Sequence, residues 1–130
     1  MKKQALLAAV SVALNFLGIQ PSDAQTRKIS TQEQRVISER LGAWLKDPLS
    51  AQYRWPAIQL GATESRPRLP YCFSVNAKNA YGGYVGFRTI VGIVTQSSGK
   101  IIGFEYTTGL NDESSVDTDR LCSVLGTPPR

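Results

Sequence analysis

The chain has 130 residues, 42% of them hydrophobic, and a formal net charge of +5. This size is typical of one domain with a modest core, and the lack of histidine removes the commonest general base and metal ligand. Lysine and arginine are spread along the chain without a run of three. That distribution is unlike a nucleic-acid footprint or a polybasic membrane anchor, although it leaves weak attraction to anionic surfaces open.

Residues 1–24 have the composition of a secretory signal peptide. Two lysines precede an apolar run over residues 5–19, and small residues follow up to Ala24. The apolar run is shorter than the ~20 residues that a membrane-spanning helix needs. We expect cleavage after Ala24, leaving residues 25–130 as one small domain in the periplasm or outside the cell, with no transmembrane span.

Cysteine occurs twice, at Cys72 and Cys122. An even count in an exported chain predicts one disulfide, and two free thiols are the alternative. A bond between them would close a loop of about 50 residues, which the chain-entropy account values at about 4 kcal/mol.

The segment Ser30-Thr31-Gln32-Glu33 predicts a helix start, because it has the pattern of a capping box. Apolar residues then recur at helical spacing, and Asp47-Pro48 is expected to end the helix. The expected buried stripe consists of Val36, Ile37, Leu41, Trp44 and Leu45.

The region after this helix is expected to be mostly irregular. We expect a further turn over residues 48–53, a short edge strand over 53–60 and an exposed loop over 61–70, where prolines recur. Trp55 beside Pro56 is the better candidate for an exposed aromatic residue that could bind a sugar. Arg54, Arg66 and Arg68 could form a basic rim, with a solvated surface as the default interpretation.

The central segment predicts a three-stranded antiparallel meander. Its strands are expected over residues 71–77, 84–96 and 100–108, with turns over 78–83 and 97–100. Because side chains alternate between the two faces of a strand, every second side chain is expected to enter the core. The expected core residues are Phe73, Val75, Phe87, Val91 and Phe104, and Ile102 and Tyr106 are expected on the Phe104 face.

A short C-terminal helix is expected over residues 116–125, capped by Ser114. Its side chains Leu121, Val124 and Leu125 should pack down on the sheet. The fold class is therefore α+β: an N-terminal helix packed on a three- to four-stranded antiparallel sheet, with a short C-terminal helix.

The Asp-x-Asp pattern near that helix could indicate a calcium loop. The glycine and the closing glutamate of that pattern are missing, which favours capping and a solvated loop. We therefore assign no metal site, no cofactor and no catalytic residue. The acidic residues concerned are Asp112, Glu113, Asp117 and Asp119.

The turn between the first two meander strands is the candidate binding site. Gly82-Gly83 permits positive φ for a chain reversal, and Asn76 and Asn79 can bond to backbone groups in the turn. In the first interpretation, these residues serve only to form the turn. The functional interpretation is a recognition loop, because tyrosine and arginine often anchor interfaces. The candidate binding residues are Lys78, Asn79, Tyr81, Tyr84 and Arg88.

The string Val-Asn-Ala-Lys-Asn-x-Tyr-Gly-Gly-Tyr-x-Gly-Phe, residues 75–87, resembles a motif of small exported bacterial proteins of unknown function. Asp47-Pro48-x-Ser50-Ala51 is also similar to a run in those proteins. The resemblance covers residues 45–87 and implies a small extracytoplasmic α+β domain without an assigned activity.

These observations predict an exported, non-enzymatic binding module that contacts an unknown protein or envelope component and no nucleic acid. The alternative is a small hydrolase that depends on carboxylates or on Lys78, or an inhibitor of a cell-envelope enzyme. A concave site with convergent titratable groups would favour the enzyme, and an exposed aromatic patch would favour the binding module.

Overall fold

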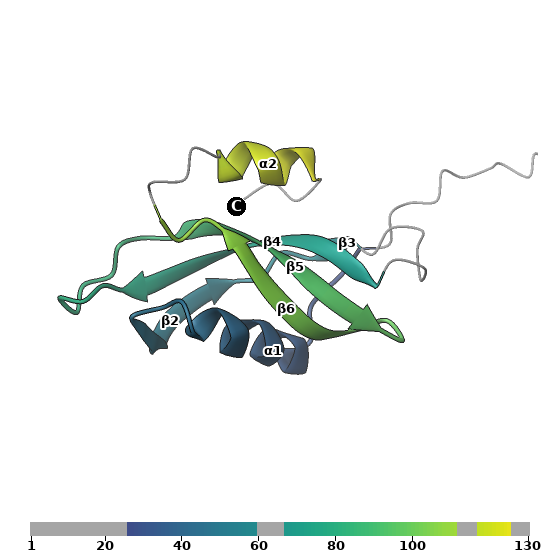
Figure 1. The fold of residues 1–130 in the computed structure, drawn as a ribbon, viewed down its shortest axis with the longest axis horizontal. Coiled ribbons are helices and arrows are strands. Elements are labelled where there is room, and N and C mark those ends of the chain that lie inside the picture. The colour runs from purple at the N-terminus through teal and green to yellow at the C-terminus, as the bar shows by residue number, and fades with distance from the viewer. Residues whose placement is uncertain (1–25, 60–66, 112–116, 126–130) are drawn as a thin grey trace, which may run out of the picture.

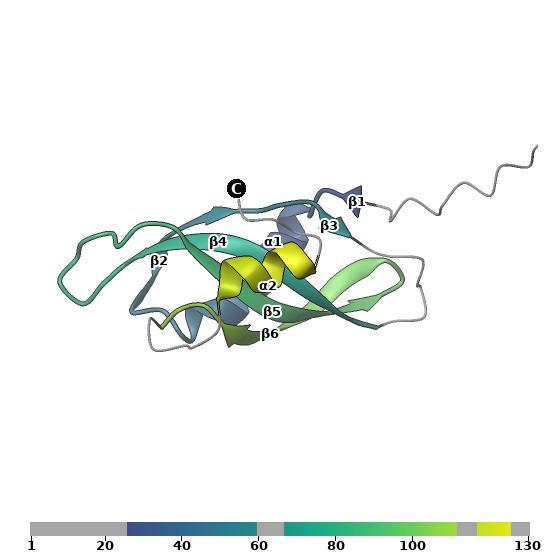
Figure 2. The same ribbon diagram turned by 90° about the horizontal axis from the view of Figure 1, so that it is seen from above.

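The computed structural model describes residues 26–59, 67–111 and 117–125, shown in two views in Figures 1 and 2. Its elements, in chain order, are β1 (Thr26–Arg27), α1 (Thr31–Gly42), β2 (Asp47–Arg54), β3 (Ile58–Gln59), β4 (Arg68–Lys78), β5 (Arg88–Ser97), β6 (Lys100–Thr108) and α2 (Thr118–Val124).

A four-stranded antiparallel curled sheet in the order β2-β4-β5-β6 forms the centre of the fold. Helix α1 lies on one face and the short helix α2 lies on the other (Figure 1). Strands β1 and β3 pair separately as a small two-stranded sheet. The predicted α+β class and the meander of β4, β5 and β6 are confirmed.

Helix α1 begins as the sequence predicts. The Glu33 amide donates to the Ser30 hydroxyl at 3.2 Å, and the Ser30 amide donates to the Glu33 carboxylate at 3.3 Å, which completes the capping box. Glu33 is nevertheless buried, because its carboxylate also accepts two hydrogen bonds from Arg27 and one from the Ile101 amide. One carboxylate therefore joins the N-terminal segment, α1 and β6.

The expected end of α1 at Asp47 was wrong. The helix ends at Gly42, and turn hydrogen bonds from the Trp44 and Leu45 amides close it. Residues 47–54 form strand β2 instead of a further turn. Pro48 is compatible with this strand because β2 is the edge of the sheet, where a missing N–H is tolerated.

The start of β4 was also misplaced, since residues 68–70 belong to this strand and not to a loop. Pro70 lies opposite Ile93, and Leu69 is buried. Residues 61–66 of the predicted loop, with Arg66, lie outside the described residues, as does Leu60, the last residue of the expected edge strand.

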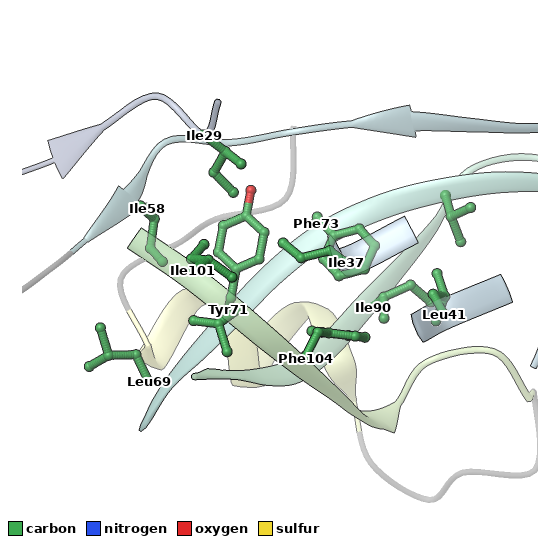
Figure 3. Packing of buried hydrophobic residues seen from close by; sticks show 12 residues of the cluster. Ile29, Ile37, Leu41, Ile58, Leu69, Tyr71, Phe73, Ile90, Ile101 and Phe104 are labelled. Atoms are coloured by element: carbon green, nitrogen blue, oxygen red, sulfur yellow. The ribbon is translucent and has the colours of Figure 1, made fainter. Parts of the chain in front are cut away.

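The main core lies between α1 and the sheet (Figure 3). Phe73 is its centre, within 5.7 Å of the ring centroids of Trp55, Tyr71 and Phe104. The buried members of this core are Ile29, Ile37, Leu41, Ile58, Leu69, Tyr71, Phe73, Val75, Ile90, Val94, Ile101 and Phe104.

The burial of the two tryptophans is the reverse of the prediction, which placed Trp44 in the core and Trp55 at the surface. Trp55 is half-buried and stacks on Tyr53 and Phe73, with ring centroids 4.7 and 5.1 Å apart. Trp44 is 62% exposed and contacts Tyr106, because α1 ends before it. Trp55 is therefore not the exposed aromatic residue that we expected.

Strand β5 starts later and faces the other way from the prediction. Phe73 lies opposite Ile90, so Ile90 and Val94 enter the main core. Val91 lies opposite Cys72 and is buried under α2, on the other face of the sheet. The prediction that Phe87 is a core residue was wrong, because it precedes β5 and is 38% exposed.

A β-bulge changes the alternation of β6. Thr95 lies opposite Gly103 and Gln96 lies opposite Ile101, so one residue of β6 has no opposing partner. Ile101 is consequently buried and Ile102 exposed, opposite to the predicted orientation of Ile102. The turn into β6 is confirmed at 97–100.

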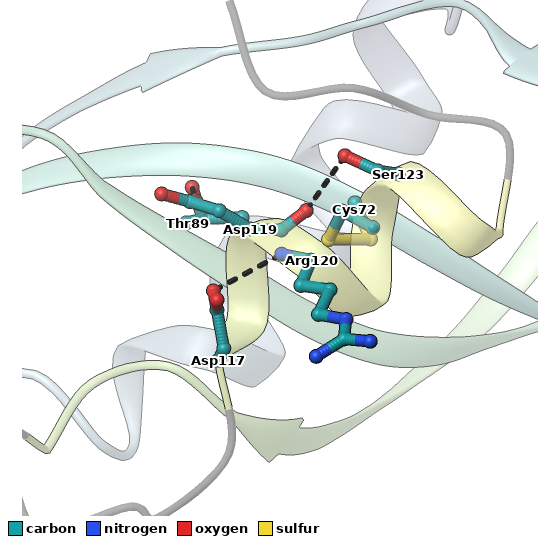
Figure 4. The surroundings of a disulfide bond; sticks show 7 residues. Cys72, Thr89, Asp117, Asp119, Arg120 and Ser123 are labelled. Carbon is teal, nitrogen blue, oxygen red and sulfur yellow. Dashed lines mark hydrogen bonds between the residues drawn. A yellow bond between two sulfur atoms is a disulfide. The ribbon is translucent and has the colours of Figure 1, made fainter.

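A disulfide between Cys72 and Cys122 holds α2 on the sheet, as predicted, with their Cα atoms 6.0 Å apart (Figure 4). Leu121 and Leu125 pack beside it, whereas Val124 is exposed and does not. Asp117 caps the helix by accepting from the Arg120 amide at 3.1 Å. The predicted cap Ser114 lies outside the described residues, as do Asp112 and Glu113.

The proposed signal segment, residues 1–24, also lies outside the described residues. Within the described part of the chain, neither helix is long and apolar enough to cross a membrane.

Candidate functional site

The hairpin arm, residues 78–87, consists of the last residue of β4 and the segment that connects β4 to β5. The arm projects beyond the end of the sheet, away from the turn between β5 and β6 (Figures 1 and 2). An antiparallel bridge between Lys78 and Tyr84 closes its base. Regular pairing resumes only at Arg88, which lies opposite Val75. The arm is therefore a distinct loop on the end of the sheet.

Hydrogen bonds hold the tip of the arm in one shape. The Asn79 amide donates to the Gly83 carbonyl at 2.9 Å, and the Gly82 amide donates to the Asn79 carbonyl at 3.1 Å. The Asn79 side chain also accepts from the Tyr81 and Gly83 amides at 3.0 and 3.1 Å. The predicted structural role of Asn79 is confirmed.

Two glycines of the arm have positive φ, Gly82 at 80° and Gly86 at 94°. The sequence predicted Gly82 and Gly83 as the reversal, and Gly83 does not adopt positive φ. The Gly86 amide donates to the Asn76 side chain at 3.0 Å, which fixes the return of the arm to the sheet. The predicted role of Asn76 is thus confirmed as well.

Large apolar side chains are exposed along and beside the arm. Tyr81 is 97% exposed at the tip, and Leu49, in the neighbouring strand β2, is 98% exposed. The Tyr84 hydroxyl donates to the Ser50 carbonyl at 2.9 Å, which brings Leu49 beside the arm. We define the arm patch as Leu49, Tyr81, Tyr84, Val85 and Phe87, all of which are exposed.

Two cations lie over aromatic rings of the arm patch. The Arg54 guanidinium carbon is 3.7 Å from the centroid of the Phe87 ring. The Lys78 ammonium nitrogen is 5.4 Å from the centroid of the Tyr84 ring. Both distances are typical of cation–π pairs, so each cation is placed next to an exposed apolar surface.

The five predicted binding residues do not have equivalent positions. Tyr81 and Asn79 are exposed, as predicted, but the Asn79 side chain is engaged within the loop. Lys78 is half-buried, contrary to the expectation that it lies at the surface. Arg88 is half-buried and donates to the Leu110 carbonyl at 3.1 Å, so it is tied to the chain after β6.

Sequence reasoning missed Leu49, Val85, Phe87 and Arg54 as neighbours of this site. Leu49 was placed in a turn, and Phe87 was placed in the core. The alternation after Gly83 gave no sign that β5 would start as late as Arg88. Gly86 was the one local sequence signal of an interrupted strand, because glycine within a strand often marks a bulge. In the structure Gly86 has positive φ.

The described groups with shifted pKa values are Arg27, Glu33, Tyr53 and Tyr71, none of which lies in the arm. Burial raises the pKa of Glu33, but the hydrogen bonds from Arg27, Ile101 and Ser30 outweigh it and lower that pKa to about 2. Burial, reinforced by the Glu33 charge, raises the pKa of Tyr71, whose hydroxyl donates to the Pro56 carbonyl. In the described residues, no group of three or more cysteines, histidines and acidic residues could hold a metal ion.

No protein-family model matches the chain, and neither a curated protein nor a solved structure matches it.

Proposed function

We propose that this protein is an exported, non-enzymatic binding module whose arm patch contacts a component of the cell envelope. The observation that carries the proposal is the exposure of Tyr81, which is 97% exposed on a loop held by hydrogen bonds. A cluster of exposed apolar side chains on a protein surface marks an interaction site more often than single exposed residues do.

The order of the loop supports a role in recognition. The hydrogen bonds that the Asn79 side chain accepts fix the backbone around Tyr81 before any partner is met. A loop whose backbone is already ordered loses less conformational entropy on association, which favours affinity. Tyrosine is also among the residues that most often dominate the binding energy of an interface.

Export is supported by the order of basic, apolar and small residues in positions 1–24. The Cys72–Cys122 disulfide is consistent with an oxidising compartment. Mass spectrometry of the protein recovered from the producing cell should find the N-terminus at or within a few residues of Gln25. An intact Met1 on the exported protein would contradict this part of the proposal.

The alternative of a carboxylate-dependent hydrolase receives little support from the described residues. Glu33 and Glu105 are each ion-paired with an arginine, and Asp117 caps α2. Lys78 lies over Tyr84 without a described acidic group at hydrogen-bond distance. An enzyme inhibitor would be a special case of the binding module, distinguished by the identity of its partner.

The proposal is tested by capture from cell envelope of the producing organism, using the exported protein with a C-terminal tag. Proteins and lipids retained by the protein are compared for the unchanged chain and for Tyr81→Ala and Leu49→Ala. We expect either substitution to weaken retention by about tenfold or more, as hot-spot truncations do. Melting temperatures should change little, because both side chains are exposed.

Ile102→Ala is the matched control, because Ile102 is an exposed aliphatic residue of β6 outside the arm patch. Tyr81→Phe tests the hydroxyl separately from the ring. Retention that is the same for Tyr81→Ala, Leu49→Ala and Ile102→Ala would contradict the proposal that the arm patch is the binding surface.

A further inference from the structure

We infer that helix α2 is a redox-controlled cover of the sheet. It lies on the sheet while Cys72 and Cys122 are bonded, and it leaves the sheet when they are two thiols. Helix α1 and the four-stranded sheet stay folded in both states. The cover lies on the face opposite α1 and does not involve the arm patch, so this device is independent of the proposed function (Figure 1).

The buried apolar side chains form two separate clusters, one on each face of the sheet. The main core lies on the α1 face, and none of its described members belongs to α2. The smaller cluster lies under α2 and consists of Cys72, Val91 and Cys122, with Leu121 and Leu125 partly buried beside them. Because the two clusters share no residue, the main core can form without α2.

Helix α2 is short and is attached by few side chains. It has seven residues, Thr118–Val124, and isolated helices shorter than roughly 12–15 residues are marginal in water. The Thr89 hydroxyl donates to the Asp119 carboxylate at 2.6 Å, but this bond is exposed, so water competes for both groups. Val124 is 78% exposed and adds nothing to the attachment. These contacts alone are a weak hold on the helix.

The disulfide provides the hold that these contacts lack. Cys72 lies on β4 opposite Val91, and Cys122 lies in α2, 50 residues further along the chain (Figure 4). A covalent link keeps α2 near its site and so raises its effective concentration there. Without the link, docking must bring together two distant segments of the chain for the contact of a few side chains.

The sheet face under α2 is suited to being uncovered. Ser74, Asn76 and Thr89 share this face with Cys72 and Val91, because side chains alternate along β4 and β5. Release of α2 would therefore expose two small apolar side chains among polar ones. Apolar patches of that size are ordinary on soluble proteins. We expect the released state to remain folded, with the Cys72 thiol at the surface of the sheet.

Thiol–disulfide exchange with a dithiol would switch the cover. A thiolate of the dithiol attacks one sulfur of the Cys72–Cys122 bond, and the other cysteine leaves as a thiolate and takes up a proton. The second thiol of the dithiol then displaces the first cysteine. The two cysteines gain two electrons and two protons, and the dithiol becomes a disulfide. Both sulfurs are buried while α2 is docked, so this exchange is slow in the docked state.

The reactivity of Cys72 in the Cys122→Ser chain tests the inference. Alkylation of its thiol by iodoacetamide is followed by mass spectrometry, without denaturant and in denaturant. We expect the two rates to agree within about tenfold, because the thiol is no longer covered. Near-ultraviolet circular dichroism should match that of the oxidised chain, since the rings around Phe73 lie in the main core.

Val94→Cys, in a chain that also has Cys72→Ser and Cys122→Ser, is the matched control. Val94 follows Val91 on β5 but is buried in the main core, on the other face. Its thiol should react without denaturant at least about 100-fold more slowly than in denaturant, because α1 stays in place. Amide exchange in the chain with both cysteines replaced provides a second measurement. Residues 118–124 should exchange at nearly their free rates, and β4 and β5 should stay protected.

Two results would overturn the inference. If Cys72 in the Cys122→Ser chain is protected as strongly as the thiol of the Val94→Cys chain, α2 stays docked without the bond. If β4 and β5 lose their protection together with residues 118–124, the sheet and α1 do not stand without α2. Capture of an envelope component through the arm patch is measured separately, so either result leaves the proposed function standing.

Discussion

The hydroxyl of Tyr84 donates a 2.9 Å hydrogen bond to the backbone carbonyl of Ser50. This bond ties the hairpin arm to the edge strand β2, which lies on the opposite side of β4 from β5. Leu49 precedes Ser50 directly, so the same bond places an exposed aliphatic residue next to an exposed aromatic one. Two segments more than 30 residues apart therefore form one surface.

The Asn79 side chain should determine the order of the arm tip. Asn79→Ala removes the acceptor of the Tyr81 and Gly83 amides, and each lost bond costs about 1 kcal/mol of local stability. We expect faster hydrogen exchange at these two amides with little change in the melting temperature. Asn79→Asp keeps an acceptor and should retain most of the protection. Unchanged exchange in Asn79→Ala would contradict the described loop.

Glu33 should make stability fall in acid. Its pKa is lowered from 4.5 to about 2 in the folded protein, so its contribution is complete above pH 4.5 and is lost as the pH falls toward 2. The contribution is on the order of 3 kcal/mol. Glu33→Gln should therefore lower stability at neutral pH and flatten its dependence on pH in this range.

Glu105→Gln is the control for that measurement, because Glu105 pairs with Arg68 at an exposed site. Exposed ion pairs contribute about 0–1 kcal/mol, so this variant should unfold almost as the unchanged chain does. Denaturant unfolding followed between neutral and acidic pH makes the comparison. Equal effects of the two substitutions would show that the Arg27–Glu33 pair has no special role.

The disulfide should protect the attachment of α2. Both cysteines are buried, so reductant alone should act slowly until denaturant opens the structure. Replacing both Cys72 and Cys122 by serine should lower the free energy of unfolding by up to about 4 kcal/mol. Loss of α2 from the sheet should appear as faster exchange in residues 118–124. A melting temperature equal to that of the oxidised chain would contradict this role.

Gly92 should be the least replaceable glycine of the sheet interior. A Cβ at this position would overlap the Phe104 ring and would lie 2.7 Å from the Glu105 carbonyl oxygen. Gly92→Ala should therefore destabilise the fold by about 1–3 kcal/mol through overpacking. Gly103→Ala is the control, because its Cβ would meet Thr95 at 3.5 Å, an ordinary contact. Thermal unfolding of the two variants measures the difference.

Local patterns predicted the elements whose cause is local. The capping box of Ser30 and Glu33 marked the start of α1, and Ser98-Gly99 marked the last hairpin, where both residues have positive φ. The pairing of Cys72 with Cys122 followed from an even count in a chain expected to be exported. The capping box and the hairpin turn depend only on residues that are neighbours in the sequence, and the disulfide depends on a single covalent bond.

Features that depend on tertiary packing were not predictable in the same way. Ile101 is buried and Ile102 exposed because of a bulge whose partner lies in β5. Trp55 is held by Tyr53 and Phe73, and Phe73 is nearly 20 residues away in sequence. No periodic pattern of apolar residues around Trp55 predicts that it packs against Phe73.

The candidate site was predicted in part. Tyr81 and Asn79 were recognised because the glycines around them predict an exposed turn. Leu49 was missed because Asp47-Pro48 has the pattern of a helix end, whereas pairing with β4 makes this segment a strand. Leu49 lies near Tyr84 because β2 pairs with β4 in the sheet. No local sequence pattern predicts that strand order.

The most direct test of the central claim is protection of Tyr81 from oxidation in the presence of envelope. Hydroxyl-radical labelling of the exported protein, with and without envelope fraction, is read residue by residue by mass spectrometry. We expect labelling of Tyr81 and Leu49 to fall on binding, while that of the exposed residues Ile102 and Val124 stays the same. Protein that binds the envelope while Tyr81 is labelled at its free rate would contradict the claim that the arm patch is the binding surface.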